Sequence, residues 1–412
     1  MSERVVRFAE AVAEVERHAA LLHEPPSERV ALTASLRRVL AGDIVADRDF
    51  PPFARSTRDG FAMSSNSGLR DSKQIQLRML GEVRAGEGWT GAALTSGECV
   101  EIMTGASLPA GADAVVMVEH VQRLVSGEIA IPLERWPATG ANVVAAGSEA
   151  RRGTTVLERG TRLAARHIGM AAACGTVELE VYRRPRVALL ATGDELVGLA
   201  ETPGPEQIRN SNSYALASAV EDACGQPVIL RVAQDNVESL RTQMQLAFEC
   251  DLAVFAGGVS AGKYDLAEKV LAEEFGAEFF FTGVRMQPGR PVVFGKTAAG
   301  KYFFGLPGNP VSALVTFGLL ARPLLAAMCG ERGWKPQFVS ARLGDDVKME
   351  PGLTRFLPAR LEAGLTGAMV RRVPWQGSGD MAALARANSY LVVDDAGCDW
   401  KADAWVTVWT GD

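Results

Sequence analysis

The sequence predicts an α/β protein with additional β parts: a doubly wound, mostly parallel sheet domain, an inserted β-rich module and a C-terminal β-barrel-like domain. From Arg186 onward, apolar runs of strand length alternate with amphipathic runs of helix length, as in sheets whose strands are connected by helices. Residues 45–145 and 337–412 instead carry short alternating runs separated by glycine and proline, which favours β structure. A chain of 412 residues is too long for one ordinary core, so we expect several domains.

The expected elements follow from the periodicity of apolar residues, taken in chain order. These residues recur at intervals of three and four over 5–22 and 28–41, which predicts two helices separated by Pro25 and Pro26. In the sheet domain, the expected strands are 187–191, 227–233, 252–256, 292–296 and 302–306, and the expected helices are 213–224, 236–249, 264–275 and 310–328.

Composition and charge argue against several classes of protein. The net charge of -6 is unlike that of a dedicated nucleic-acid binder, and no apolar run approaches the ~18 residues of a membrane span. The N-terminal residues open an amphipathic helix rather than a signal peptide. Six cysteines form no Cys-x-x-Cys pair and four histidines have no metal-ligand spacing, so we expect reduced core thiols, no zinc site and a cytoplasmic protein.

The most informative motif is a glycine-rich segment after the strand at 252–256. Three glycines within six residues let backbone N–H groups close around an oxyanion, and Asp265 adds a hard oxygen ligand suited to Mg²⁺ beside a phosphate. We therefore expect a phosphorylated ligand here; the alternative is a tight strand–helix connection without a ligand. The residues expected to bind are Gly257, Gly258, Val259, Ser260 and Gly262.

Acidic side chains follow the predicted strands. Asp194 and Glu195 come after the first strand, and Asp235 follows the second. Because the carboxyl ends of parallel strands share one edge of a sheet, these acids and Asp265 should converge there if the strands are neighbours. One or two carboxylates, with phosphate oxygens and water, would make a Mg²⁺ site. The alternative is that Asp235, or Asp194 and Glu195, simply cap helices.

The last predicted strand ends in a Pro-Gly-Asn-Pro string at 307–310. Pro310 suits the first helical position and Asn309 the N-cap, so capping alone would explain the string. Arg290, on a Pro-Gly-Arg-Pro turn, supplies a cation whose planar fork suits tetrahedral oxyanions. The alternative is an arginine on a surface turn.

Seven strings extend these motifs along nearly the whole chain. They are Pro51-Pro52-Phe53 with Asp59-Gly60-Phe61-Ala62, Ile102-Met103-Thr104-Gly105-Ala106 with Gly111-Ala112-Asp113, Ala191-Thr192-Gly193-Asp194-Glu195, Asn210-Ser211-Asn212, Gly257-Gly258-Val259-Ser260-Ala261-Gly262 with Asp265, Pro288-Gly289-Arg290-Pro291 and Leu306-Pro307-Gly308-Asn309-Pro310-Val311-Ser312. In this order they resemble the molybdopterin molybdenumtransferase family, which includes the E domain of gephyrin. Any one string is weak, but seven in order are very specific.

The resemblance implies the last step of molybdenum cofactor synthesis, in which molybdate is inserted into adenylylated molybdopterin and AMP leaves with Mg²⁺ present. It implies a homodimer whose active sites lie between the sheet domain of one subunit and the β-rich module of the other, and a transient contact with molybdopterin adenylyltransferase. The implied parts are an N-terminal helix (1–26), a small connecting α/β domain (27–48 and 144–184), the inserted module (49–143), the molybdopterin-binding sheet domain (185–333) and the C-terminal β domain (334–412).

By resemblance, the catalytic residues are Asp59, Thr104, Glu195, Asp235 and Asp265, of which Glu195, Asp235 and Asp265 hold Mg²⁺. The implied cofactor-binding residues are Thr192, Gly193, Asp194, the five residues of the glycine segment, Arg290, Pro307, Gly308, Asn309, Pro310 and Ser312. The chain departs from the family pattern at Glu149, where Asp is usual, and at Gln287, where Lys is frequent. Ala382 and Ala383 replace serines of some members and, with Gln287, touch the region implied to hold molybdate.

Three alternatives stay open. A molybdopterin adenylyltransferase would share the sheet domain and the glycine segment, but not the additional domains. A non-catalytic scaffold of the gephyrin type would need a receptor-binding extension or a long linker, and neither is evident in the sequence. The third alternative is a degenerate homologue that binds cofactor without turnover.

Overall fold

The structure, a computed structural model, describes residues 4–67, 73–257 and 266–411. Five candidate site residues lie outside the described residues: Gly258, Val259, Ser260, Gly262 and Asp265. The chain forms two compact units, of which unit 1 consists of Met1–Ala41, Gly160–Ala164 and Glu178–Asp412, and unit 2 of Gly42–Arg159 and Ala165–Val177. Both units contain sheets and helices, so the prediction of a multi-domain α/β chain with β-rich parts is confirmed.

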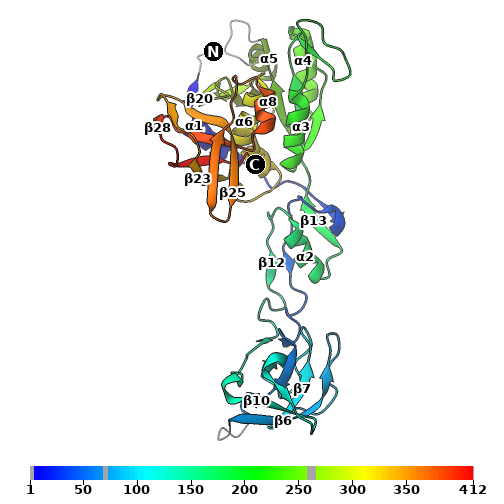
Figure 1. The fold of residues 1–412 in the computed structure, drawn as a ribbon. Coiled ribbons are helices and arrows are strands. Elements are labelled where there is room, and N and C mark those ends of the chain that lie inside the picture. Colours follow the sequence, from blue (N-terminus) through cyan, green and yellow to red (C-terminus); the bar gives the residue numbers. More distant parts are fainter. Residues whose placement is uncertain (1–3, 68–72, 258–265, 412) are drawn as a thin grey trace. The chain divides into compact units, whose positions relative to one another are not determined.

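Unit 1, which contains the end of the chain marked C in Figure 1, is built on a six-stranded sheet in the order β17-β14-β18-β22-β21-β19. The first four of these strands are parallel. At one edge β21 pairs antiparallel with β22, and β19 pairs antiparallel with β21. The periodicity predicts all of these strands except β19, although β17 is shorter than expected. The strands are β14 (Arg186–Ala191), β17 (Gln226–Ile229), β18 (Leu252–Ala256), β19 (Glu278–Phe281), β21 (Val293–Lys296) and β22 (Tyr302–Leu306).

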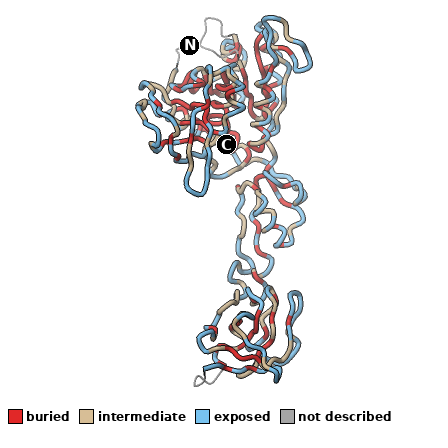
Figure 2. The backbone as a smooth tube through the Cα atoms, viewed as in Figure 1, coloured by how far each residue is buried: buried red, intermediate tan, exposed pale blue. Residues whose placement is uncertain are grey.

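Helices pack on both faces of this sheet. α3 (Asn212–Asp222) and the helix that begins at Pro310 belong to one apolar core, whereas α4 (Val237–Ala247) and α5 (Leu266–Phe275) belong to the other. Leu189 of β14 lies in the first core and its neighbour Leu190 in the second, as the two-residue period of a strand requires. Figure 2 shows the central strands as buried. A strand buried on both faces is apolar throughout, which is why the sequence predicts it.

The helix after β22 has three parts: α6 (Pro310–Thr316), a π-helical segment η4 (Phe317–Ala321) and α7 (Arg322–Met328). By length and composition it is apolar enough to cross a membrane, so the expectation that no run approaches a membrane span is wrong for this segment. However, 78% of its apolar window is buried inside the protein. Burial on all sides is typical of a core helix.

The C-terminal part of unit 1 forms a sheet that closes on itself. Its order is β1-β20-β25-β26-β23-β29-β27, and an additional pairing of β27 with β25 completes a barrel-like ring. Strand β20, which lies between β19 and β21 in the sequence, pairs parallel with β25, and β1 pairs with β20. The elements are β1 (Val5–Arg7), β20 (Gly283–Gln287), β23 (Phe338–Leu343), β24 (Val347–Met349), β25 (Thr354–Gly364), β26 (Gly367–Arg372), α8 (Met381–Arg386), β27 (Ser389–Val393), β28 (Cys398–Trp400) and β29 (Trp405–Trp409).

The two N-terminal helix predictions need correction. Residues 5–22 begin with strand β1, because pairing with β20 takes up its three residues, and the helix α1 spans only Phe8–Ala19. The predicted helix 28–41 is wrong: the chain forms strand β2 (Ser27–Ala31) and a 3-10 turn, η1 (Leu32–Ala34). Strand β2 pairs with β13 (Glu178–Tyr182), a partner far along the chain. Such a non-local pairing overrides local propensity and leaves no periodic signal.

Unit 2 has its own core around a second six-stranded sheet, in the order β8-β5-β7-β6-β10-β9. Phe61 and Ala62 are neighbours on β5 and face two different apolar clusters. Two short antiparallel pairs, β4 with β11 and β3 with β12, are formed by segments that precede and follow this sheet in the sequence. The elements are β3 (Ile44–Val45), β4 (Arg55–Ser56), β5 (Gly60–Met63), β6 (Gln74–Val83), β7 (Glu98–Ile102), β8 (Ala114–Met117), η2 (Val118–His120), β9 (Gln122–Arg123), β10 (Glu128–Pro132), η3 (Leu133–Arg135), β11 (Val143–Val144), β12 (Thr155–Leu157) and α2 (Ala165–Ala173).

Candidate functional site at the carboxyl end of the parallel sheet

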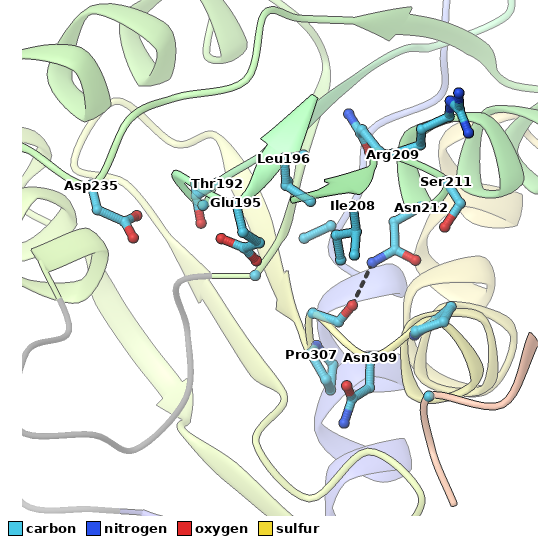
Figure 3. Close-up of a pocket in the computed structure, with 18 of the residues that line it drawn as sticks. Thr192, Glu195, Leu196, Ile208, Arg209, Ser211, Asn212, Asp235, Pro307 and Asn309 are labelled. Carbon is cyan, nitrogen blue, oxygen red and sulfur yellow. Dashed lines mark hydrogen bonds between the residues drawn. The ribbon is translucent and has the colours of Figure 1, made fainter. Parts of the chain in front are cut away.

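A cavity of about 1060 Å³ opens at the carboxyl end of the parallel strands of unit 1 (Figure 3). Loops that follow β14, β18 and β22 form its walls, so residues far apart in the sequence meet at one edge of the sheet. The predicted site residues that line the cavity are Thr192, Gly193, Glu195, Asp235, Gly257, Pro307, Gly308, Asn309 and Pro310.

Two glycines allow close approach of the strand-end loops. Gly257 has a φ of +90°, and a Cβ added there would lie 2.8 Å from the carbonyl oxygen of Thr192. Gly193 has a φ of +141°, and a Cβ there would lie 2.4 Å from Glu195 Oε2. Glycine adopts such conformations without steric conflict. The backbone therefore requires both glycines here, whether or not a ligand binds.

Within the residues that the structure describes, the buried hydroxyl of Thr192 has no partner. The residue is 5% exposed, and its Oγ1 makes no hydrogen bond within the described protein. Its backbone is fixed, since its N–H donates to the Ala256 carbonyl at 3.2 Å and the residue bridges Ala233. An unpaired buried hydroxyl destabilises a fold by roughly 1–3 kcal/mol. Because Thr192 lines the cavity, a polar ligand there can supply the missing partner.

Three acidic side chains gather around the same loops. Asp194 Oδ1 accepts a hydrogen bond from the N–H of Asp235 at 3.2 Å. Figure 3 shows the carboxyl groups of Glu195 and Asp235 pointing toward one another. Burial, and then the charges of Asp194 and Glu195, raise the pKa of Asp235 above its usual value. The local potential is therefore negative, which favours a bound cation.

The alternative that these acids cap helices is wrong. Asn236, not Asp235, is the N-cap of α4, and its side chain accepts from the N–H of Ser239 at 2.9 Å. Glu195 leads into the short strand β15 (Leu196–Val197), which pairs with β16 (Ile208–Arg209). Within the described ranges, no three His, Cys, Asp or Glu side chains lie close enough together to hold a metal ion; the third predicted ligand is outside those ranges.

The Pro-Gly-Asn loop is held from two sides. Asn212, the first residue of α3, donates from Nδ2 to the Gly308 carbonyl at 2.6 Å (Figure 3). Asn309 occupies the N-cap position of α6, as predicted, but its side chain does not cap the helix. It donates instead to Ser378 Oγ at 2.8 Å, and the Val311 N–H donates to the Ser378 carbonyl at 3.0 Å. A loop of the C-terminal barrel thus fixes the loop that lines the cavity.

Of the predicted binding residues that the structure describes, three are not among those that line the cavity. Asp194 and Arg290 are exposed, and Ser312 is buried within α6. The carbonyl of Arg290 accepts from the Val284 N–H at 2.9 Å, and the next residue, Pro291, lines the cavity instead. The structure does not place the side chains of Asp194, Arg290 and Ser312 in the cavity wall, so their predicted role in cofactor binding stays a prediction.

One wall of the cavity consists of residues that were not predicted as site residues. It consists of Leu196, the segment Ile208–Asn212, and Gly379 and Met381 from the barrel. The string Asn210-Ser211-Asn212, which belongs to this wall, was part of the family resemblance. No binding or catalytic role was assigned to it, because its residue types indicate none. Arg209 brings the cationic side chain of this wall, and its Nε donates to the carbonyls of Leu199 and Glu201 at 3.0 and 3.1 Å.

Asp59 and Thr104 form a small site of their own in unit 2. Asp59 precedes β5 and Thr104 follows β7, and both are exposed. Asp59 Oδ1 accepts two hydrogen bonds from Thr104, from Oγ1 and from the backbone N–H, each at 2.7 Å. These bonds, the side-chain one first, lower the pKa of Asp59, so its carboxylate is ionised at neutral pH. Elsewhere in the unit, Glu149 pairs with Arg55 at 3.1 Å.

Comparison with known proteins places both units in one family. Family models match in three segments: the MoeA N-terminal region (domain I and II) over residues 6–175, a probable molybdopterin binding domain over 188–327 and the MoeA C-terminal region (domain IV) over 340–410. The molybdopterin molybdenumtransferase of Staphylococcus aureus (strain MRSA252) is 33% identical over 386 residues, 93% of this chain and 91% of that protein. The chain belongs to the molybdopterin molybdenumtransferase family.

The resemblance drawn from the seven strings is thereby confirmed, and other members of the molybdenumtransferase family agree. The molybdopterin molybdenumtransferase of Nostoc sp. (strain PCC 7120) is 35% identical over 327 residues, 78% of this chain and 74% of that protein. The crystal structure of the molybdopterin biosynthesis MoeA protein from Pyrococcus horikoshii OT3 covers 98% of this chain and 99% of that chain, with a TM-score of 0.80 and 28% identity. Another crystal structure, of a molybdopterin biosynthesis MoeA protein from Pyrococcus horikosii, gives a TM-score of 0.74 and 32% identity, covering 99% of this chain and 100% of that one. Most of the cavity wall belongs to the segment that matches the probable molybdopterin binding domain.

Proposed function

We propose that this chain is a molybdopterin molybdenumtransferase that inserts molybdate into adenylylated molybdopterin and releases AMP. The observation that carries the proposal is one cavity that combines close-packed glycine loops, a buried unpaired hydroxyl and clustered carboxylates. Matches to both MoeA terminal regions support this function over an adenylyltransferase-like enzyme. The pKa of Asp235, raised by burial and then by the charges of Asp194 and Glu195, supports catalysis over a non-catalytic cofactor-binding scaffold.

The substrates set an electrostatic problem that the cavity must solve. Molybdate is a dianion and the dithiolene of molybdopterin is electron-rich, so the protein has to bring like charges together. Fixed N–H and O–H donors offset such repulsion better than water does, because they need no reorganisation. Thr192 Oγ1 is one such donor in the described part of the cavity wall.

In this proposal Glu195, Asp235 and Asp265 hold Mg²⁺. The donor set fits the ion, because Glu195 and Asp235 line the cavity with carboxylate oxygens. Burial, and then the charges of Asp194 and Glu195, raise the pKa of Asp235, and a bound cation would offset both effects. Carboxylates, water and substrate phosphate oxygens are the ligands that Mg²⁺ prefers. Held by these carboxylates, the ion would polarise the phosphoanhydride and would make AMP a better leaving group. The hydrogen bond from Asp235 N–H to Asp194 keeps the two acidic loops together.

The remaining family features are part of the same proposal. The active protein is a homodimer, and Asp59 of the partner subunit and Thr104 of the partner subunit complete each site. The chain is cytoplasmic, makes a transient contact with molybdopterin adenylyltransferase, and divides into the five parts bounded at residues 26, 48, 143, 184 and 333. The lowered pKa of Asp59 keeps its carboxylate ionised, which supports a role as a fixed negative charge in the shared site.

Thr192→Val should raise the KM for adenylylated molybdopterin about five- to tenfold, the loss of one hydrogen bond of ~1 kcal/mol or slightly more. Its stability in urea should stay equal or rise, because valine leaves no buried hydroxyl unpaired. Thr297→Val is the matched control, since the Oγ1 of Thr297 is buried but accepts from the Lys301 N–H at 3.1 Å. The control should lose stability and keep its KM. The opposite pattern would show that Thr192 meets no ligand.

Arg290→Ala should weaken molybdate binding by about 1 kcal/mol, because an exposed charge is screened by water. Arg290→Lys should recover only part of the affinity, since an ammonium lacks the bidentate fork. Equilibrium dialysis with molybdate, and separately with AMP, measures both variants. Wild-type affinity of Arg290→Ala for both ligands would identify Arg290 as an arginine on a surface turn.

One assay tests the proposed function directly. The purified protein is incubated with adenylylated molybdopterin, Mg²⁺ and molybdate, and both AMP and active molybdenum cofactor are measured. The two products should appear together, in equal amounts, and only when molybdate is present. AMP release without formation of molybdenum cofactor would refute the transferase assignment in favour of a hydrolase. Substrate binding without either product would favour a scaffold.

A further inference from the structure

The Asn-Ser-Asn segment (210–212) lines the cavity, but the proposed reaction gives it no role. Its first residue, Asn210, is 7% exposed. Asn210 Oδ1 accepts a hydrogen bond from the Ser213 N–H at 3.2 Å, and Asn210 Nδ2 donates to Ser213 Oγ at 2.9 Å. These two bonds tie the segment to the first turn of α3, so the start of this helix is fixed by a buried side chain.

The same segment is joined to the loop that carries Glu195. Strand β16 directly precedes the segment and pairs with β15, which directly follows Glu195. The Ile208 N–H donates to the Glu195 carbonyl at 2.9 Å. Two residues further on, the Asn210 N–H donates to the Val197 carbonyl at 3.0 Å. Because Glu195 is one of the carboxylates proposed to hold Mg²⁺, these bonds fix the segment to the acidic side of the cavity.

The last residue of the segment contacts a different loop of the cavity. Asn212 Nδ2 donates to the Gly308 carbonyl at 2.6 Å, and Figure 3 shows this contact as a dashed line. Gly308 in turn lies against Gly257, because a Cβ added to Gly308 would be 3.5 Å from Gly257 Cα. One side-chain amide thus holds a backbone carbonyl of the Pro-Gly-Asn loop, and that loop is packed against the end of β18.

We propose that Asn212 is a positioning residue, which sets the distance between the acidic loop at Glu195 and the Pro-Gly-Asn loop at Gly308. This inference rests on the proposed function, in which Glu195 holds Mg²⁺ and the Pro-Gly-Asn loop binds the cofactor. An amide suits the role, because a carbonyl oxygen can only accept and the Nδ2 group of asparagine can only donate. Reacting groups that are misplaced by about 1 Å lose on the order of 10²-fold in rate.

A positioning role predicts a defect in turnover rather than in binding. Asn212→Leu removes the donor, keeps nearly the same volume and adds no charge beside anionic substrates. Its kcat should fall by about 10- to 100-fold. Its KM for adenylylated molybdopterin should stay within about twofold of the wild-type value, because the groups that contact the substrate are unchanged. Asn212→Gln keeps the amide, one methylene further out, and should regain part of the lost kcat.

A second measurement on the same full-length proteins does not depend on activity. Hydrogen exchange is followed in the peptide that contains Val311, whose N–H donates to the Ser378 carbonyl at 3.0 Å. Because Val311 directly follows the loop that Asn212 holds, loss of the Asn212 bond should let this amide open more often. Exchange in Asn212→Leu should therefore be about tenfold faster than in the wild type.

Asn388→Leu is the matched control. Asn388 also donates from Nδ2 to a backbone carbonyl, that of Leu361 at 3.0 Å, but it belongs to the barrel and does not line the cavity. This variant should lose stability in urea and keep its kcat, its KM and the exchange rate at Val311, because the lost bond lies away from the cavity.

Three results would overturn the proposal: wild-type exchange in Asn212→Leu, wild-type kcat in that variant, or a raised KM at unchanged kcat, which would show direct contact with the substrate. Failure of the proposed function is recognised separately, because the wild-type protein would then form no molybdenum cofactor. In that case the exchange measurement alone decides whether Asn212 positions the loop.

Discussion

Asp235→Asn should lower kcat by about 10²–10³-fold, the usual effect of removing one electrostatic group from an active site. The amide has almost the same shape and leaves the backbone bond from residue 235 to Asp194 in place, so the loop should keep its conformation. What disappears is the negative charge that faces Glu195 across the cavity and is proposed to hold Mg²⁺. The measurement is AMP release at saturating substrate over a range of Mg²⁺ concentrations.

The same variant should gain stability at neutral pH. Since the pKa of Asp235 is raised in the folded state, folding favours its protonated form, and stability falls as the pH rises from the ordinary value of 3.8 through the folded pKa. At pH 7 the ionised carboxylate destabilises the fold, and asparagine removes this effect. Urea unfolding at pH 7 should show the variant to be more stable, with the difference vanishing near pH 3.

Glu238→Gln is the matched control for both measurements. Glu238 is exposed in the first turn of α4, one turn from Asp235, and does not line the cavity. Its variant should keep kcat within about twofold, as surface substitutions usually do. Equal losses in both variants would mean that net charge near α4, not the position of Asp235, governs turnover.

Asp59→Ala and Asp235→Ala should each inactivate the enzyme, and mixing the two inactive proteins should restore about one quarter of the wild-type activity. In a random mixture half of the dimers are heterodimers, and each heterodimer has one site with both carboxylates intact if the sites are shared between subunits. The premise is that Asp59 is fixed and ionised by Thr104, so that it acts as a charged group at a site it does not build alone.

A second mixture provides the control for this experiment. Asp59→Ala and Thr104→Ala alter the same small site in unit 2, so every site of their heterodimer lacks one of the two residues and activity should stay absent. Subunit exchange is followed independently by native mass spectrometry. Full exchange without restored activity in the first mixture would show that each active site lies within a single chain.

The parts of the fold that the sequence predicts are those with a local cause. Strand β18 is apolar throughout because both of its faces are buried, and the apolar run 310–328 is too long for a strand, so its length predicts a helix. Strand β2 has no such signal, because it exists through pairing with β13. Arg37, with a φ of +64°, interrupts the region where a helix was expected, and nothing in its residue type announces that conformation.

The site divides in the same way. Glu195 and Asp235 could be placed from the sequence because the carboxyl ends of parallel strands must share one edge, and both line the cavity. The exposed Arg290 shows the limit of this reasoning, since distance along the chain does not fix the direction of a side chain. The contact with Ser378 could not be predicted from the sequence for another reason. The hydrogen bond that Asn309 donates to Ser378 depends on how the sheet domain and the barrel pack.

Strand β20 has a consequence for any attempt to dissect the molecule. It leaves the sheet domain, pairs with β25 of the barrel on one side and with β1 on the other, and returns to β21. A chain truncated after residue 333 would lack β25, and β20 would present a row of unpaired N–H and C=O groups to solvent. Such an exposed edge recruits strands from other molecules. The fragment should therefore precipitate when it is expressed alone, although the sequence places a domain boundary at that residue.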